Sequence, residues 1–173
     1  MRAVAPSEAS IAVLRAISRS GFSYAQSKSL CDAAGWRLVD DELDLGYVRY
    51  DMILTSESNE QRPLSLLITE SGTLPFAFVP LFWFDEYADG REPFDRAYDA
   101  LAGQITGILG TPTKLGAYGY PHRAGRPYFF AGWVLSDATL TLVQDEFDIQ
   151  FGMDVTLWVQ PAGTRVEVPV QHT

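Results

Sequence analysis

Cysteine and histidine are scarce in this chain, and their scarcity excludes several kinds of protein. Its 173 residues include one cysteine, Cys31, and two histidines, His122 and His172. A single thiol can form neither an internal disulfide nor a cluster of thiolate ligands, so we expect a reducing, cytoplasmic compartment. No apolar run reaches the roughly 18 residues that a membrane-spanning helix needs. The apolar stretch near the start is interrupted by Arg15, which argues against a signal peptide.

Familiar catalytic patterns are missing as well. The sequence has no G-x-S-x-G nucleophile elbow, no H-E-x-x-H zinc motif and no C-x-x-C pair. The glycines of GILGTPTKLG do not make a phosphate loop, because Lys114 follows Gly110 by four residues and the strand-then-helix context is missing. We therefore expect no cofactor and no metal, and we expect binding rather than catalysis.

Positive charge is in short supply. The chain has 13 Lys and Arg against 22 Asp and Glu, a net charge of −9, which argues against nucleic acid or an anionic membrane as the ligand. The charge is uneven: residues 1–39 carry 5 basic and 2 acidic residues (5 − 2 = +3), whereas residues 40–173 carry 8 and 20 (8 − 20 = −12). The acidity therefore belongs to the later part of the chain.

Apolar residues are abundant enough for one domain, residues 1–173, with a substantial core. They make up 47% of the chain, and aromatic residues 13%. The apolar spacing predicts a helical part over 1–39, with helices over 7–19 and 24–34, and Gly35 ends the second of them. The acidic residues 40–44 are interpreted as a linker to a sheet-rich part over 40–173.

From Tyr47 the apolar period changes from that of a helix to that of a strand. Strands are expected over 47–54, 64–68, 76–84, 128–135 and 138–144, with a long final strand over 147–159 that bends near Gly152. One helix over 94–109 interrupts them, ended by Gly110, and 111–126 is expected to be a long loop. The order α-α-β-β-(β)-α-β-β-β predicts an α+β fold, with a mainly antiparallel sheet and the helices packed on one face. Pro80 predicts that segment 76–84 is an edge strand, a bulge or an irregular segment.

Four acids crowd the stretch QDEFDIQFGMDVTLWVQ, residues 144–160. Asp145 and Glu146 are placed at the turn before the final strand, and Asp148 and Asp154 on its solvent-facing side. For any single acid, a solvated strand face is the simpler interpretation. Asp148 and Asp154 lie about 20 Å apart along an extended strand. A catalytic carboxylate pair needs roughly 5–10 Å, which would require the chain to fold near Gly152.

Taken together, these acids form a candidate surface for a basic protein, with an exposed Trp158 as an apolar anchor. A second acidic group lies in the linker. Its members are Asp40, Asp41, Glu42 and Asp44.

Two other functions are also compatible with the sequence. The run FAFVPLFWF, residues 76–84, is either core or an exposed apolar groove of a dimeric secretion-type chaperone or adaptor. His122, in a loop with Tyr118 and Tyr120, is either an exposed loop histidine or part of a small-molecule site.

The second half of the chain resembles a known group of proteins. A helix ending in LGTP, a glycine-rich loop, a tryptophan-containing strand and a final strand reading VTLWVQP are similar to small α+β immunity proteins of bacterial polymorphic toxin and contact-dependent systems. The similarity covers residues 94–161. It implies a cytoplasmic inhibitor that binds one cognate toxin stoichiometrically and blocks its active site.

Overall fold

The structure is a computed structural model that describes residues 3–42, 46–55, 60–67, 76–84, 91–118, 127–148 and 152–166. The side chains of six of these residues are not described: Glu42, Trp83, Phe84, Glu146, Phe147 and Asp148. The elements, in chain order, are α1 (Glu8–Arg19), α2 (Tyr24–Ala33), β1 (Arg37–Glu42), β2 (Tyr47–Ile53), β3 (Gln61–Leu67), β4 (Phe76–Phe84), α4 (Arg91–Leu109), β5 (Lys114–Tyr118), β6 (Tyr128–Val134), β7 (Thr139–Asp148) and β8 (Gly152–Gln160).

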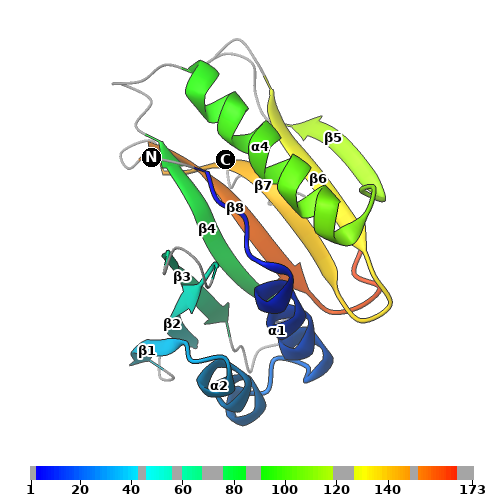
Figure 1. The fold of residues 1–173 in the computed structure, drawn as a ribbon. Coiled ribbons are helices and arrows are strands. Elements are labelled where there is room, and N and C mark those ends of the chain that lie inside the picture. The colour runs from blue at the N-terminus through cyan, green and yellow to red at the C-terminus, as the bar shows by residue number, and fades with distance from the viewer. Residues whose placement is uncertain are drawn as a thin grey trace.

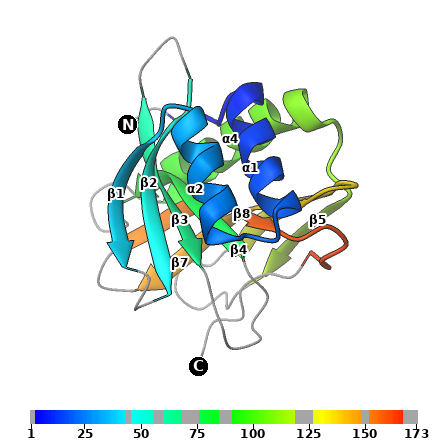
Figure 2. The ribbon, with the colours of Figure 1, turned by 90° about the horizontal axis from the view of Figure 1, so that it is seen from below.

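All the strands belong to one sheet in the order β1-β2-β3-β4-β8-β7-β6-β5. Every neighbouring pair is antiparallel. The helices cover one face of the sheet, with α4 crossing β6 to β8 and α1 and α2 at the other end (Figures 1 and 2). The predicted α+β fold, with a mainly antiparallel sheet and helices on one face, is therefore confirmed.

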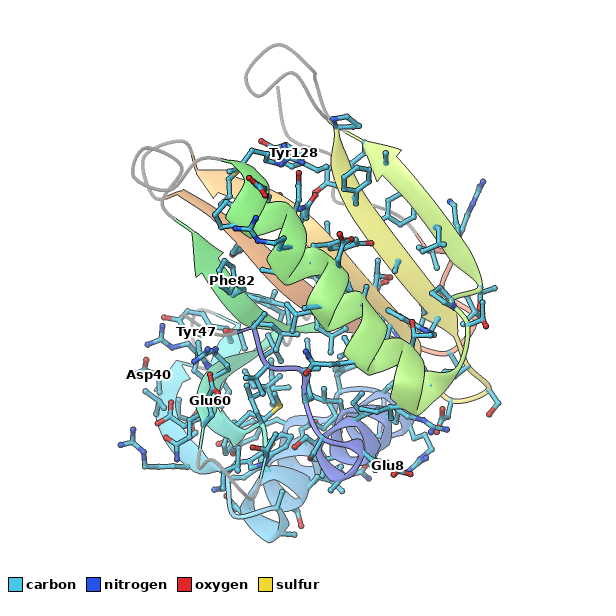
Figure 3. All side chains as sticks on the ribbon, turned by 45° about the horizontal axis from the view of Figure 1, so that its top comes forward. Glu8, Asp40, Tyr47, Glu60, Phe82 and Tyr128 are labelled. Atoms are coloured by element: carbon cyan, nitrogen blue, oxygen red, sulfur yellow. The ribbon has the colours of Figure 1, made fainter. Side chains whose placement is uncertain are left out.

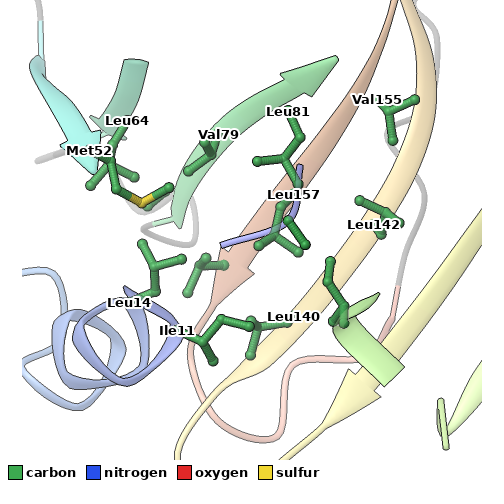
Figure 4. Packing of buried hydrophobic residues seen from close by; sticks show 14 of the residues in the cluster. Ile11, Leu14, Met52, Leu64, Val79, Leu81, Leu140, Leu142, Val155 and Leu157 are labelled. Atoms are coloured by element: carbon green, nitrogen blue, oxygen red, sulfur yellow. The ribbon is translucent and has the colours of Figure 1, made fainter. Parts of the chain in front are cut away.

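The main core lies between the helices and the sheet. A smaller buried cluster, formed by Phe130, Val143 and Val166, lies on the other face of the sheet. In β2, residues Val48, Tyr50 and Met52 are fully buried, as the period of two requires. Ile11 and Leu14 lie on one face of α1 and are 2% and 0% exposed. Figure 4 shows them among side chains from several strands: Met52, Val79, Leu140 and Leu157.

Three segments differ from their predicted structure. Residues 37–42 form β1, which pairs with β2, so the first residues of the linker predicted over 40–44 belong to a strand. Residues 114–118, expected in a loop, form β5 on β6. The single long strand predicted over 147–159 is instead the end of β7 and all of β8, which pair with each other as a hairpin. The apolar alternation of this stretch runs from one strand into the next, so periodicity alone could not reveal the reversal.

Pro80 lies at a bulge, which was one of the structures that its position predicted. The register between β4 and β8 shifts between Pro80 and Phe82. A proline is tolerated there because a bulge interrupts the ladder hydrogen bonds that proline cannot donate. β4 is not an edge strand, since β3 and β8 flank it.

The basic residues of the N-terminal helices pair with acids of the chain itself. Arg15 and Arg19 of α1 hold Asp137, in the turn between β6 and β7, at 2.9 and 2.7 Å. Burial alone would raise the pKa of Asp137, but the two guanidinium groups outweigh it and lower that pKa. The side chain is 12% exposed. This contact fastens α1 to the far half of the sheet.

Candidate functional site

The β7–β8 hairpin brings two of the predicted acids together. The register places Asp145 directly opposite Asp154, and the next pairs on the same face are Val143 with Thr156 and Thr141 with Trp158. These residues lie on the face of the sheet away from the residues that pack under α4, because neighbours along a strand alternate between faces. The two carboxylates are therefore cross-strand neighbours near one end of the sheet, with side chains on the same face.

Both carboxylates are largely withdrawn from water. Asp145 is 6% exposed, and Asp154 is half-buried and accepts a hydrogen bond of 2.8 Å from the Thr156 hydroxyl. The pKa of Asp154 is raised to about 6: burial is the main cause, the Thr156 hydrogen bond opposes it, and the charge of Asp145 adds to it. Such a pair can accept either a proton or a cation between its oxygens.

Tyr118 reaches this pair from β5. Its hydroxyl donates to the backbone carbonyl of Gln144, next to Asp145. Burial, followed by the charges of Asp145, Tyr128 and Asp154, raises the pKa of Tyr118. The phenol therefore stays protonated and acts as a fixed hydrogen-bond donor.

The predicted position of Asp145 in a turn is wrong, because Asp145 lies within β7 and is buried. Asp154 lies on the sheet face away from the helices, as predicted, but it is half-buried rather than solvated. Glu146 and Asp148 lie on the last residues of β7, where the register shifts between Asp145 and Asp148. Asp148 pairs with Gly152, but the side chains of both acids are among those not described.

Trp158 is half-buried rather than exposed. Its ring lies 4.9 Å from that of Phe76 and 5.4 Å from that of Phe78, both on β4. Its Nε1 and the Oγ1 of Thr141, the residue opposite, are buried without a hydrogen-bond partner among the residues that the structure describes. Trp158 therefore belongs to an aromatic cluster on this face and is not a free anchor.

The second acidic group is dispersed along an edge strand. Asp40 pairs with Arg49 of β2, and Asp41 accepts a hydrogen bond from the Tyr24 hydroxyl. Figure 3 shows Asp40 at the far side of the molecule from Tyr128, near which α4 begins. The Glu42 side chain and all of Asp44 lie outside the described residues. Asp40 is thus partly neutralised, which makes this group the weaker candidate.

A polar network on the sheet face opposite to the acid pair was not predicted from the sequence. Arg91 donates to Asp95 at 2.8 Å, and the side-chain amide of Gln144 donates to Asp95 at 3.0 Å. The side-chain oxygen of Gln144 accepts from the backbone amide of Phe129 at 2.9 Å. Arg91 also lies 4.9 Å from the centre of the Tyr128 ring. The network fastens the first turn of α4 to β6 and β7. In the sequence, only the i, i+4 spacing of Arg91 and Asp95 indicated this network, because Gln144 comes from a strand that is distant in sequence.

The structure describes the residues of only one of the two other candidate functions. Val79 and Leu81 of the FAFVPLFWF run are 0% exposed and Phe82 is 8% exposed, so this face of β4 is core rather than an open groove. His122 and Tyr120 lie outside the described residues, and their predicted role stays a prediction.

Within the described residues, no group of three or more His, Cys, Asp or Glu is arranged to hold a metal ion. None of the helices described is both long and apolar enough to cross a membrane. Comparisons with protein-family models, with curated proteins and with solved structures found no match to this chain.

Proposed function

We propose that this protein is an acidic binding domain for a basic protein, and that the partner binds at the end of the sheet that carries Asp145 and Asp154. In the form that the resemblance implies, it is a cytoplasmic immunity protein that covers the active site of a cognate bacterial toxin. Inhibition by occlusion needs no chemistry from the inhibitor, which agrees with the lack of catalytic motifs in the sequence.

The opposition of Asp145 and Asp154 is the observation that carries the proposal. Like charges directly opposite each other on paired strands destabilise a sheet, and burial increases that cost. The next pair on the same face, Val143 opposite Thr156, is uncharged, so this part of the hairpin does not require acids. Two acids held next to each other and shielded from water are typical of a functional site.

A cation from a partner would reverse the sign of this interaction. A lysine or arginine placed beside the pair would be attracted by both carboxylates at once. The gain would be larger than at an open surface, because the pair is partly shielded from water.

The distribution of the remaining charges supports a basic partner. Eight of the ten lysine and arginine residues in the described part of the chain form ion pairs with acids of the chain itself. The basic side chains are thus largely committed internally, and the net charge of −9 remains as an attractive field for a basic protein.

The test begins with identification of the partner. Tagged protein is incubated with a lysate of its native host at low and at high salt, and retained proteins are identified by mass spectrometry. The partner is then purified and titrated against the wild type and against Asp145→Asn/Asp154→Asn. The control, Glu8→Gln/Asp32→Asn, removes the same charge from α1 and α2, at the other end of the sheet (Figure 1).

We expect the double substitution on the hairpin to weaken the affinity by at least about tenfold and to reduce its salt dependence, with little change for the control. For an immunity protein, an equimolar amount must also abolish the activity of the partner. Equal effects of the two double substitutions, or retention of no basic protein, would contradict the proposal.

A further inference from the structure

The two edges of the sheet are protected very differently. β1, at one edge, reads RLVDDE and has a charged residue at four of its six positions. Its register against β2 shifts between Leu38 and Asp40. Charged side chains and bulges are the devices that keep a sheet edge from pairing with another strand. The β1 edge is therefore protected against pairing with a further strand.

β5, at the other edge, lacks both devices. It reads KLGAY and pairs with β6 without a register shift. Its one charged side chain, Lys114, lies over the Phe130 ring and donates to the Val166 carbonyl at 3.3 Å. Leu115 is 68% exposed on the opposite face. The outer side of β5 is thus a regular, nearly uncharged backbone edge, with no neighbouring strand in the part of the chain that the structure describes.

The surroundings of β5 are apolar as well. Lys114 is the only charged residue in 110–118 and 127–135. Four large apolar side chains of the described residues are markedly exposed, and three of them, Leu115, Phe129 and Val134, lie on β5 and β6. Since the charge of −9 is borne by other segments, the residues of these two strands add little electrostatic repulsion between two copies of the protein.

We propose that the β5 edge is a self-association surface, at which β5 pairs antiparallel with β5 of a second copy to form a symmetric dimer with one continuous sheet. This inference does not depend on the proposed function. A symmetric interface requires a strand that is complementary to itself. With the two-fold axis at Gly116, Leu115 of each copy lies opposite Ala117 of the other, so a large exposed side chain meets a small one.

Gly116 suits the centre of such an interface. The ring of Phe130 occupies the space where a Cβ at this position would lie, only 2.5 Å away. The centre of β5 therefore carries no side chain, and two copies of its backbone can approach each other closely. A second copy fits better than a charged partner, because Lys114 is the one charged residue of β5 and β6, and its amine is engaged by the Phe130 ring and the Val166 carbonyl.

The interface is small, so the dimer should be weak. Two five-residue strands bury less surface than a standard stable interface, and we expect dissociation constants in the range of about 10 to 100 μM. The concentration series must therefore extend from about 1 μM to about 500 μM.

Sedimentation velocity over that series tests the inference with two matched substitutions. Leu115→Glu places an acid on the β5 edge, and Val39→Glu makes the same change at β1, where Val39 is 41% exposed. The wild type and Val39→Glu should dimerise alike, whereas Leu115→Glu should weaken dimerisation by at least about tenfold. A wild type that stays monomeric at the highest concentration, or a dimer that responds equally to both substitutions, would overturn the inference.

Amide hydrogen exchange supplies a readout that needs no variant. Amides within 114–118 should exchange more slowly as the wild-type concentration rises, and amides within 37–42 should not change. A dimer without this added protection in 114–118 would associate through another surface, and the inference would be wrong.

Discussion

Asp154 holds its proton more tightly in the folded chain than in the unfolded one. Its folded pKa is about 6, against about 3.9 in an unfolded chain. The contribution of Asp154 is most favourable below the unfolded pKa and is lost as the pH rises through about 4 to 6. Neutralising this residue should therefore matter at pH 7.5 and hardly at pH 4.

We expect Asp154→Asn to raise the free energy of unfolding by up to about 3 kcal/mol at pH 7.5, since each pKa unit corresponds to about 1.4 kcal/mol. Asparagine can still accept the hydrogen bond from Thr156. Urea unfolding of both proteins at pH 4 and pH 7.5 measures the difference. A variant that is less stable at pH 7.5, or equally stabilised at both pH values, would show that Asp154 is not strained by its surroundings.

Two buried threonines of β7 allow a matched test of the stability contributed by a single hydroxyl group. Thr139 and Thr141 are 0% and 1% exposed. The Thr139 hydroxyl donates to the Thr164 carbonyl at 3.0 Å, whereas the Thr141 hydroxyl has no hydrogen-bond partner among the described residues. Thr139→Val should lower the free energy of unfolding by about 1 kcal/mol, and Thr141→Val should raise it by a similar amount. Thermal unfolding of the two variants side by side checks the opposite signs; a loss of stability in both would refute the assignment.

At the scale of elements, Asp137 joins α1 to the β6–β7 turn. We expect Asp137→Asn to lower the free energy of unfolding by about 1–2 kcal/mol at pH 7, a value reduced by the exposure of Arg19. Because the folded pKa of Asp137 is lowered, this stabilisation is fully present above the unfolded pKa and is lost as the pH falls through the folded pKa.

The control for this contact is Asp32→Asn, which breaks an exposed pair with Lys28 within α2. Its cost should stay below about 0.5 kcal/mol. Denaturant unfolding at pH 7 and pH 3 separates the two variants. Equal costs for the two variants at pH 7, or a cost for Asp137→Asn that is as large at pH 3 as at pH 7, would speak against the bridge.

The end of α4 allows a second test with an internal control. Gly110 has φ +83° and its amide donates to the Thr106 carbonyl, as the predicted helix stop requires. Gly110→Ala should lower the free energy of unfolding by about 1 kcal/mol, because alanine is strained at that φ. Gly103→Ala, in the same helix with open space around it, should instead raise it by up to about 1 kcal/mol. Differential scanning calorimetry of the two variants measures both changes in stability. A change of the opposite sign in either variant would contradict the prediction.

At the scale of the whole molecule, the two proposals concern different surfaces. Partner binding uses the acid pair on the β7–β8 hairpin, and self-association uses the β5 edge, where Lys114 is the only charged residue. The charge distribution separates them: binding to a basic partner should weaken as salt is added, whereas the dimer should be insensitive to salt or strengthened by it. The partner titration and the sedimentation series, each carried out at two salt concentrations, therefore distinguish failure of one proposal from failure of the other.

The sequence by itself determined the fold class, the helices and most strands, and the stops at Gly35 and Gly110. These features depend on apolar periodicity and backbone freedom, which are local properties of the chain. It also indicated the bulge at Pro80, because a proline cannot donate a ladder hydrogen bond.

Only the tertiary structure decided what depends on register and on distant neighbours. Periodicity continues unchanged through the β7–β8 reversal, so the opposition of Asp145 and Asp154 was invisible in the sequence. The strands β1 and β5 are short edge strands with weak apolar alternation, and pairing with β2 and β6 makes them strands. The same acids that looked like a solvated surface became a half-buried pair, because burial is set by which strands and side chains lie opposite one another and not by the residues alone.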